Sequence, residues 1–387
     1  MLCLFYVISL VTFFAPWIGN DGYYYYAFTR SVVIDGDIQL ANEFRFNPNH
    51  YDVPHVHGLP SPTARTDDGY APSGAPVGTS LLWIPFFLLA HGIAFVANML
   101  GFPISMNGYS LPYLALVGWG STLYAFLALT LTYLICRDYF SKAASLLAVL
   151  ALWFGSSLFD YMYLETTMSH SADLFVAALF LYVYCRTERV WGIGRWTLLG
   201  LLGGLLAITR FQNVVYLVVP GLLLIRELAI GLSRARWDKA GEAALKSATF
   251  ALYFAIPWIL ETILFRALVT KDMVGRLLGP EGMFAVSVSQ VVEALFSMRD
   301  GLFTITPIVA FAVMGVAFFY RKDRALFFFL AVPALLQLLI ASSFTYRFWG
   351  PHFGMRYLIN PIPLFILGLA ALLDKRWIPL KVAAIPI

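Results

Sequence analysis

Runs of apolar residues long enough to cross a lipid bilayer recur along almost the whole of this 387-residue chain. A spanning helix needs about 20 predominantly apolar residues, and 60% of the chain is hydrophobic while only 12% is charged. An isolated strand in lipid would leave its backbone groups unpaired at a cost of several kcal/mol each, so these runs must be helices. The sequence therefore predicts an all-α, polytopic membrane protein.

Ten apolar segments are expected to cross the membrane, and we treat residues 1–387 as a single domain because no internal repeat divides them. The first segment has neither a basic start nor a small-residue cleavage site, so we interpret it as a spanning helix and not as a signal peptide. The predicted crossings are 2–18, 109–135, 143–159, 166–185, 196–209, 211–225, 247–265, 302–320, 325–344 and 357–373.

The basic residues give these crossings an orientation. Sixteen of the 26 Lys and Arg lie in five connecting segments, which the positive-inside rule places in the cytoplasm. The opposite, outer face then receives the segments with the most unusual polar residues. The predicted cytoplasmic segments are 136–142, 186–195, 226–246, 321–324 and 374–381, and the outer ones are 160–170, Arg210, 266–301 and 345–356.

Segment 81–100 decides the side of the long first loop. It is long enough to span, but Pro85 interrupts it and His91 lies in its middle. If it spans, loop 19–80 is cytoplasmic, and charge alone does not choose because loops of this length are poor evidence. We favour a juxtamembrane helix within an outer loop, 19–108, because this gathers the unusual polar residues on one face.

Composition argues against several other classes of protein. Cys3, Cys136 and Cys185 form no CxxC pair, so neither a disulfide framework nor a zinc knuckle is expected. The net charge of +4 is spread over many loops, and nucleic acid is therefore not an expected partner.

One loop segment has residue types that suit a divalent metal ion. His50, Asp52, His55 and His57 lie close together there, but their spacing follows no established ligand pattern. A solvated loop is the simpler interpretation, so no metal ligand is assigned and a divalent ion stays an open possibility.

Carboxylates follow the first predicted helix. Asp21 lies just beyond it, and Asp35 and Asp37 flank Gly36 further on. A carboxylate at the membrane edge is a candidate base, but Asp21 also suits the N-cap of a helix, and Asp35 and Asp37 suit a turn. Both interpretations stay open for each residue.

Two further segments combine polar residues with an approach to an apolar helix. Tyr70 begins a Pro- and Gly-rich stretch, YAPSGAPVGT, which is either a turn before a helix or a loop shaped for a lipid headgroup. Glu165 and His170 lie at the mouth of the helix after LETTMS. Ionisable groups at membrane depth are costly and usually functional, although both residues also fit a wetted helix cap.

Arginines on the outer face are candidates for binding a phosphate. Arg210 divides an apolar stretch into two short helices, and Arg347, His352 and Arg356 are interleaved with aromatic residues in FTYRFWGPHFGMRYL. Guanidinium groups bind lipid phosphates well. The alternatives are snorkelling of Arg210 to the interface and an ordinary aromatic belt.

These pieces, in this order, resemble the GT-C superfamily of membrane glycosyltransferases, in particular the branch of protein O-mannosyltransferases and lipid A aminoarabinose transferases. The similarity covers nearly the whole chain. It rests on an acid followed by YYYYAFTR, on DGDIQLANE, on the Pro/Gly loop, on ETTMSH and on WGPHFGMRYL. The resemblance implies that Asp21 is the base or positions the acceptor, and that 81–100 lies beside the membrane.

The chain departs from that branch at two points. Gly22 follows the acid where mannosyltransferases commonly have a second acid, and Tyr70-Ala71-Pro72 stands where some relatives have a lysine. Protein mannosylation is therefore not implied. Many relatives also continue beyond the tenth crossing, so a C-terminal part is expected to be either missing or absent here.

The expected activity is transfer of a hexosyl or pentosyl group from a polyprenyl-phosphate donor, on the periplasmic side of the inner membrane. Polyprenyl phosphate is already a good leaving group, so one base is enough. Asp21 accepts the proton of the acceptor hydroxyl, and Arg210, Arg347 or Arg356 stabilises the departing phosphate. Direct displacement inverts the anomeric centre, and the acceptor is a lipid, a glycan or a protein.

Two other functions use similar residues. A transporter or flippase of lipid-linked saccharides also needs intramembrane polar groups, but transporters often carry paired repeats, which the sequence lacks. A ligase or polymerase of lipid-linked glycans shares the carrier and differs in the donor, and the sequence alone separates it poorly.

Overall fold

The computed structural model describes residues 1–16, 18–19, 21–45, 65–187, 192–269, 287–343 and 353–374. Within these residues every regular element is a helix, which confirms the all-α prediction. Six of the helices are long and apolar enough to cross a membrane, so the protein is an integral, multi-pass membrane protein. They are α4 (Gly78–Met99), α5 (Leu111–Tyr139), α9 (Gly192–Thr209), η2 with α10 (Phe211–Ser233), α11 (Trp237–Leu268) and α16 (Arg324–Ser343).

The other predicted crossings are helical but shorter: α1 (Leu2–Phe13), α6 (Lys142–Gly155), α8 (His170–Arg186), α15 (Ile308–Lys322) and α17 (Ile362–Leu373). At about 1.5 Å per residue, the 12 residues of α17 span only about 18 Å of a hydrocarbon core that is about 30 Å thick. The chain before α17 and around α8 therefore lies partly at membrane depth. Such irregular backbone is tolerated there only when protein or a wet cavity surrounds it.

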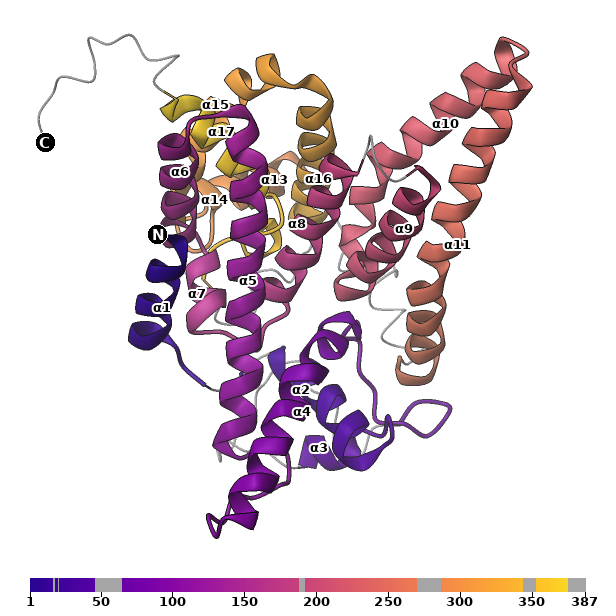
Figure 1. Ribbon diagram of the computed structural model, residues 1–387. Coiled ribbons are helices and arrows are strands. Elements are labelled where there is room, and N and C mark those ends of the chain that lie inside the picture. The colour runs from indigo at the N-terminus through magenta and orange to yellow at the C-terminus, as the bar shows by residue number, and fades with distance from the viewer. Residues whose placement is uncertain are drawn as a thin grey trace, which may run out of the picture.

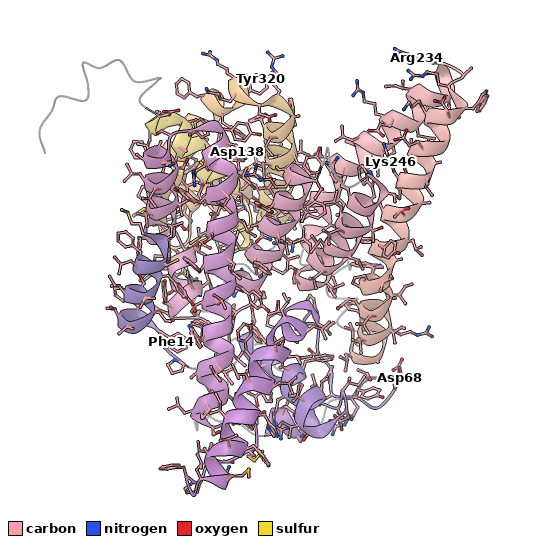
Figure 2. All side chains as sticks on the ribbon, viewed as in Figure 1. Phe14, Asp68, Asp138, Arg234, Lys246 and Tyr320 are labelled. Atoms are coloured by element: carbon pink, nitrogen blue, oxygen red, sulfur yellow. The ribbon has the colours of Figure 1, made fainter. Side chains whose placement is uncertain are left out.

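Successive long helices run in opposite directions, which brings the basic connections to one end of the bundle. Figure 2 shows Asp138, Arg234 and Tyr320 toward that end and Phe14 and Asp68 toward the other. As far as they are described, the connections assigned to the cytoplasm thus share one end. The turns that carry the candidate site residues belong to the opposite end.

The first loop forms a layer at that opposite end, made of α2 (Gly22–Arg30), η1 (Ser31–Asp35), α3 (Ala41–Arg45) and α4 (Figure 1). Helix α4 packs along α5, and Trp83 and Phe87 of α4 are fully buried against Tyr26 and Tyr113. Helix α1 leads into this layer and α5 leaves it at the same end (Figure 1), while the outer position of loop 19–108 stays a prediction. The juxtamembrane position of 81–100 itself stays a prediction.

The bundle is packed closely enough to require small residues at its helix contacts. A Cβ atom on Gly315 of α15 would lie 2.0 Å from the carbonyl oxygen of Gly368 on α17. In lipid, where no hydrophobic force drives helices together, such backbone approach is a main source of association. Helices α15 and α17 therefore pack backbone against backbone at this contact.

Candidate active site

Asp21 stands at the start of α2 and faces an arginine from near the other end of the chain. Its Oδ2 lies 3.2 Å from Nη1 of Arg356, and the side chains are 57% and 15% exposed, respectively. Asp21 occupies the N-cap position of α2 but its side chain makes no capping hydrogen bond. The acid is therefore engaged by Arg356 and open to solvent, and it does not act as a helix cap.

Close packing fixes the backbone beside Asp21. A Cβ atom on Gly22 would lie 2.6 Å from both the carbonyl oxygen and Oγ1 of Thr167. The backbone N–H of Ala15 donates to the carbonyl of Tyr163 at 2.9 Å. The chain after α1 thus lies directly on the 163–167 turn, and there is no room at position 22 for a second acid.

Arg210 lies at the break between two helices. Helix α9 ends at Thr209, and Arg210 itself is extended, with φ −156° and ψ 125°, before η2 begins. Its Nη1 lies 3.2 Å from Oγ of Ser169 and 3.1 Å from Nδ1 of His170. The same Nη1 lies 3.4 Å from Nε2 of His170, and because a guanidinium only donates hydrogen bonds, the imidazole ring accepts from Arg210.

Tyr357 connects the two arginines. The guanidinium carbons of Arg210 and Arg356 each lie 5.2 Å from the centre of the Tyr357 ring. Such cation–π contacts stabilise by about 0.5–2 kcal/mol. Gln212 also donates to the backbone carbonyl of Tyr357 at 3.5 Å. Two cations, one aromatic ring and one exposed acid therefore share a single site.

A buried carboxylate, Asp173, lies behind Arg210. Its Oδ1 accepts hydrogen bonds from Oγ1 of Thr209, at 3.0 Å, and from Asn213. Its Oδ2 accepts from Asn360 at 2.8 Å and lies 3.9 Å from Nε of Arg210. Sequence reasoning missed Asp173, although an ionisable group inside an apolar helix is a signal of function.

A second arginine–carboxylate cluster occupies the outer layer. Nη1 of Arg30 pairs with Asp35 at 2.5 Å and with Glu43, and its Nε donates to the carbonyl of Asn107 at 2.8 Å. The Glu43 side chain is completely buried. Burial raises the pKa of Glu43 to about 7, even though Arg30 opposes the rise. Hydrogen bonds from Asn42, Glu43 and Arg30 outweigh burial at Asp35 and lower its pKa.

Asp37 and Tyr70 lie apart from the Asp21–Arg356 pair. Asp37 accepts from Ser31 at 2.8 Å and from the N–H of Gln39 at 3.0 Å, beside Gly36 with φ +73°. This is the turn that the sequence offered as the alternative to a site. Tyr70 packs in an apolar cluster that also contains Leu268.

The remaining candidates are less completely defined. Glu165 is half-buried in the turn that supports Gly22. Arg347 and His352, together with the segment containing His50, Asp52, His55 and His57, lie outside the described residues. Among the residues that the structure does describe, no group of three or more His, Cys, Asp or Glu side chains could hold a metal ion.

Solved structures resemble the whole described architecture. The crystal structure of ArnT from Cupriavidus metallidurans in the apo state matches with a TM-score of 0.54 at 12% identity, over 98% of this chain and 59% of that one. The archaeal oligosaccharyltransferase AglB from Archaeoglobus fulgidus, in complex with an inhibitory peptide and a dolichol-phosphate, matches with a TM-score of 0.51 at 12% identity, over 95% of this chain and 49% of that one.

An apo crystal structure of the Archaeoglobus fulgidus oligosaccharyltransferase matches with a TM-score of 0.54 at 13% identity, over 100% of this chain and 52% of that one. The chain thus spans roughly half of the length of these proteins. No protein-family model matches the sequence, and no curated protein matches it significantly. At such low identity the likeness shows the fold alone: the chain shares the fold of ArnT and of the archaeal oligosaccharyltransferase, which agrees with the predicted GT-C type of architecture.

Proposed function

We propose that this protein is a glycosyltransferase that moves a sugar from a polyprenyl-phosphate donor to an acceptor hydroxyl, on the outer face of the inner membrane. The observation that carries the proposal is the contact between Asp21, an exposed acid, and Arg356, a largely buried cation, next to the second cation Arg210. One group accepts a proton and two groups bind an anion, which is what this reaction needs.

In the proposed reaction Arg356 binds the donor phosphate and Asp21 is the base. Without donor, Arg356 compensates the charge of Asp21. A donor phosphodiester carries one negative charge, and its binding to Arg356 frees Asp21 to face the acceptor hydroxyl. Asp21 takes the hydroxyl proton as the acceptor oxygen bonds to the anomeric carbon. The bond between that carbon and the phosphate oxygen breaks, and the phosphate leaves with the electron pair.

The arginines stabilise the negative charge that develops on the departing phosphate. A single displacement of this kind inverts the configuration of the sugar. His170 accepts a hydrogen bond from Arg210 and so orients one of the two cations. We assign Glu165 to the acceptor side, because it lies in the same turn that supports the backbone beside Asp21.

The position of the site suits a lipid carrier. His170 begins α8 and Arg356 lies shortly before α17, and both helices are too short to span the bilayer. This position favours contact between a membrane-bound phosphate and Arg356. In AglB, which shares the fold, the solved complex contains a dolichol-phosphate. The basic connections at the opposite end favour the outer face for the site.

The test is transfer by purified protein in nanodiscs. Wild type, Asp21→Asn and Asp35→Asn are incubated with a panel of radiolabelled polyprenyl-phosphate hexoses and pentoses and with candidate acceptors, and the loss of label from the donor is followed. A positioned base contributes about 10²- to 10⁴-fold, so we expect at least a 100-fold loss in Asp21→Asn with donor binding retained.

Asp35→Asn is the matched control, because it removes an acid from the same loop but from the Arg30 cluster. It should keep its rate within severalfold of wild type. Equal loss in both variants would contradict the role of Asp21. If no donor is consumed while labelled lipid-linked sugar crosses a proteoliposome membrane, the protein is a transporter instead.

A further inference from the structure

Three separate segments bring the cations and their orienting histidine into the site, and each has a tie to the same buried carboxylate. His170 is in the first turn of α8, Arg210 is at the break between α9 and η2, and Arg356 begins the short helix η3 (Arg356–Leu358). None of these positions is inside a long helix, so regular hydrogen bonding alone does not fix them. Asp173 lies one turn beyond His170.

The ties to Asp173 flank the site residues closely along the chain. Thr209 immediately precedes Arg210, and Asn213 follows it by three residues; both side chains donate to Oδ1 of Asp173. Asn360 follows η3 and donates to Oδ2 at 2.8 Å. Each hydrogen bond to Asp173 therefore comes from a residue within four positions of Arg210 or Arg356.

The network is sealed from water. Asp173 is 2% exposed, Asn213 is 0% exposed and Asn360 is 3% exposed. A buried charge is costly unless it is paired and hydrogen-bonded, and in a membrane helix such a group usually serves function. Nε of Arg210 also lies 3.9 Å from Oδ2 of Asp173, so the carboxylate acts directly on one of the cations.

We infer that Asp173 is a positioning residue that holds Arg210 and the Arg356–Tyr357 pair at the spacing needed to bind the phosphate of the donor. The inference rests on the proposed function, because it names the group that organises the same site. Asp173 touches no reacting atom. Its negative charge and its two oxygens set the direction of the Arg210 guanidinium and the register of η3 against η2.

The decisive variant is Asp173→Asn, which keeps the size of the side chain but places an amide N–H₂ opposite side chains that already donate. The matched control is Gln337→Leu. Gln337 is 1% exposed on α16 and donates to Oδ1 of Asn213 at 3.0 Å. It therefore belongs to the same buried network, but it does not flank Arg210 or Arg356 in the chain.

The first readout is the dissociation constant of a short-chain polyprenyl phosphate, measured in nanodiscs. We expect at least a tenfold increase for Asp173→Asn and no change for Gln337→Leu. In turnover, misplacement of a catalytic geometry by about 1 Å costs about 100-fold in rate. Asn360→Ala removes the tie between the η3 segment and Asp173, together with the 2.9 Å hydrogen bond from Asn360 to Oδ1 of Asn213, and it should raise the same dissociation constant if Asp173→Asn does not fold.

The second readout needs no donor. Phenylglyoxal modifies guanidinium groups, and mass spectrometry of the Arg210 peptide gives the rate. We expect severalfold faster modification of Arg210 in Asp173→Asn than in wild type or in Gln337→Leu. If wild type binds no polyprenyl phosphate, the proposed function fails, and the reactivity of Arg210 still decides whether Asp173 holds it.

Two results would overturn the inference. One is a folded Asp173→Asn that matches wild type in phosphate affinity and in Arg210 reactivity. The other is a Gln337→Leu variant that weakens phosphate binding as much as Asp173→Asn does, since that would show general loosening of the bundle and no specific positioning.

Discussion

Two arginine–carboxylate clusters involve acids of the first loop, and they differ in how completely they are buried. Arg30 contacts two carboxylates from its own layer, and the partner Glu43 is fully buried. Arg356 reaches Asp21 from a distant part of the chain, and Asp21 stays 57% exposed. The first cluster joins residues that are close in sequence and is mostly buried. The second joins segments that are distant in sequence and leaves Asp21 exposed to solvent.

This difference separates an acid that holds structure from an acid that can react. A carboxylate that is buried with its arginine is unavailable to a substrate, and removal of its partner leaves an uncompensated buried charge. The open pair is exposed on one side only: Arg356 is 15% exposed but Asp21 is 57% exposed, so water can solvate Asp21 when Arg356 no longer contacts it. Function is therefore expected at Asp21, and stability at Glu43.

The substitutions Arg356→Ala and Arg30→Ala should give the largest effects, the first on transfer activity and the second on stability. Loss of a preorganised charge-stabilising donor lowers kcat by about 10²- to 10³-fold, so Arg356→Ala should be nearly inactive with a melting temperature close to that of wild type. Arg30→Ala should lose up to about 3 kcal/mol of stability above pH 7, because ionised Glu43 is then buried without its partner. Transfer assays and thermal unfolding in detergent measure both.

If Arg356→Ala and Arg30→Ala lose activity and stability to the same extent, the distinction between the two clusters is wrong. Arg356→Lys sharpens it further, because lysine keeps the charge but lacks the planar fork of arginine. Partial activity in Arg356→Lys would indicate that charge matters more than the shape of the guanidinium.

The pH dependence of stability should come from the closed cluster. The unfolded chain releases the Glu43 proton near its ordinary pKa of 4.5, and the folded chain holds it until about 7. Between these values the folded state binds the extra proton, so stability is highest below about 4.5 and falls as the pH rises through 7. At about 1.4 kcal/mol per unit of pKa, the loss is at most about 3.5 kcal/mol.

Glu43→Gln carries no titratable proton and should flatten this slope. Thermal unfolding of both proteins between pH 5 and pH 8 measures the contribution of Glu43 together with that of the groups whose titration it affects. A wild-type slope that is identical to that of Glu43→Gln would assign the pH dependence elsewhere.

The smallest effect is expected where the backbone of the open cluster is tightest. Gly22→Ala places a methyl group 2.6 Å from the Thr167 carbonyl, and such overpacking costs about 1–3 kcal/mol. Because the displaced backbone bears Asp21, we expect transfer to fall together with the melting temperature. Gly241→Ala is a control, since a Cβ there meets no atom within 4 Å. A Gly22→Ala protein with wild-type activity would show that Asp21 tolerates movement.

The helical fold could be predicted because the apolar runs leave few alternatives in lipid. Their ends were predicted less accurately: the apolar run 143–159 continues past Gly155, but α6 ends there, and a turn at Ser156 and Ser157 precedes α7 (Leu158–Tyr163). Average hydropathy does not reveal such a turn, because two serines between apolar and aromatic residues hardly lower the mean hydropathy of the segment.

The sequence could not separate the acids. Asp21 and Asp35 both stand next to a glycine near apolar residues, and only the distant partner Arg356 distinguishes them. Asp173 escaped notice because an acid in the first turn of a helix is ordinary. Its importance becomes visible only when Thr209, Asn213 and Asn360 are seen to converge on it.

The pairing of Asp21 with Arg356 also has a consequence for biogenesis. Asp21 enters the membrane region with the first helices, whereas Arg356 is made only after α16 (Figure 1). During most of translation Asp21 therefore has not yet met its partner Arg356. A nascent chain that stalls before η3 can insert most of its helices but cannot assemble the pair, so activity reports on completed insertion.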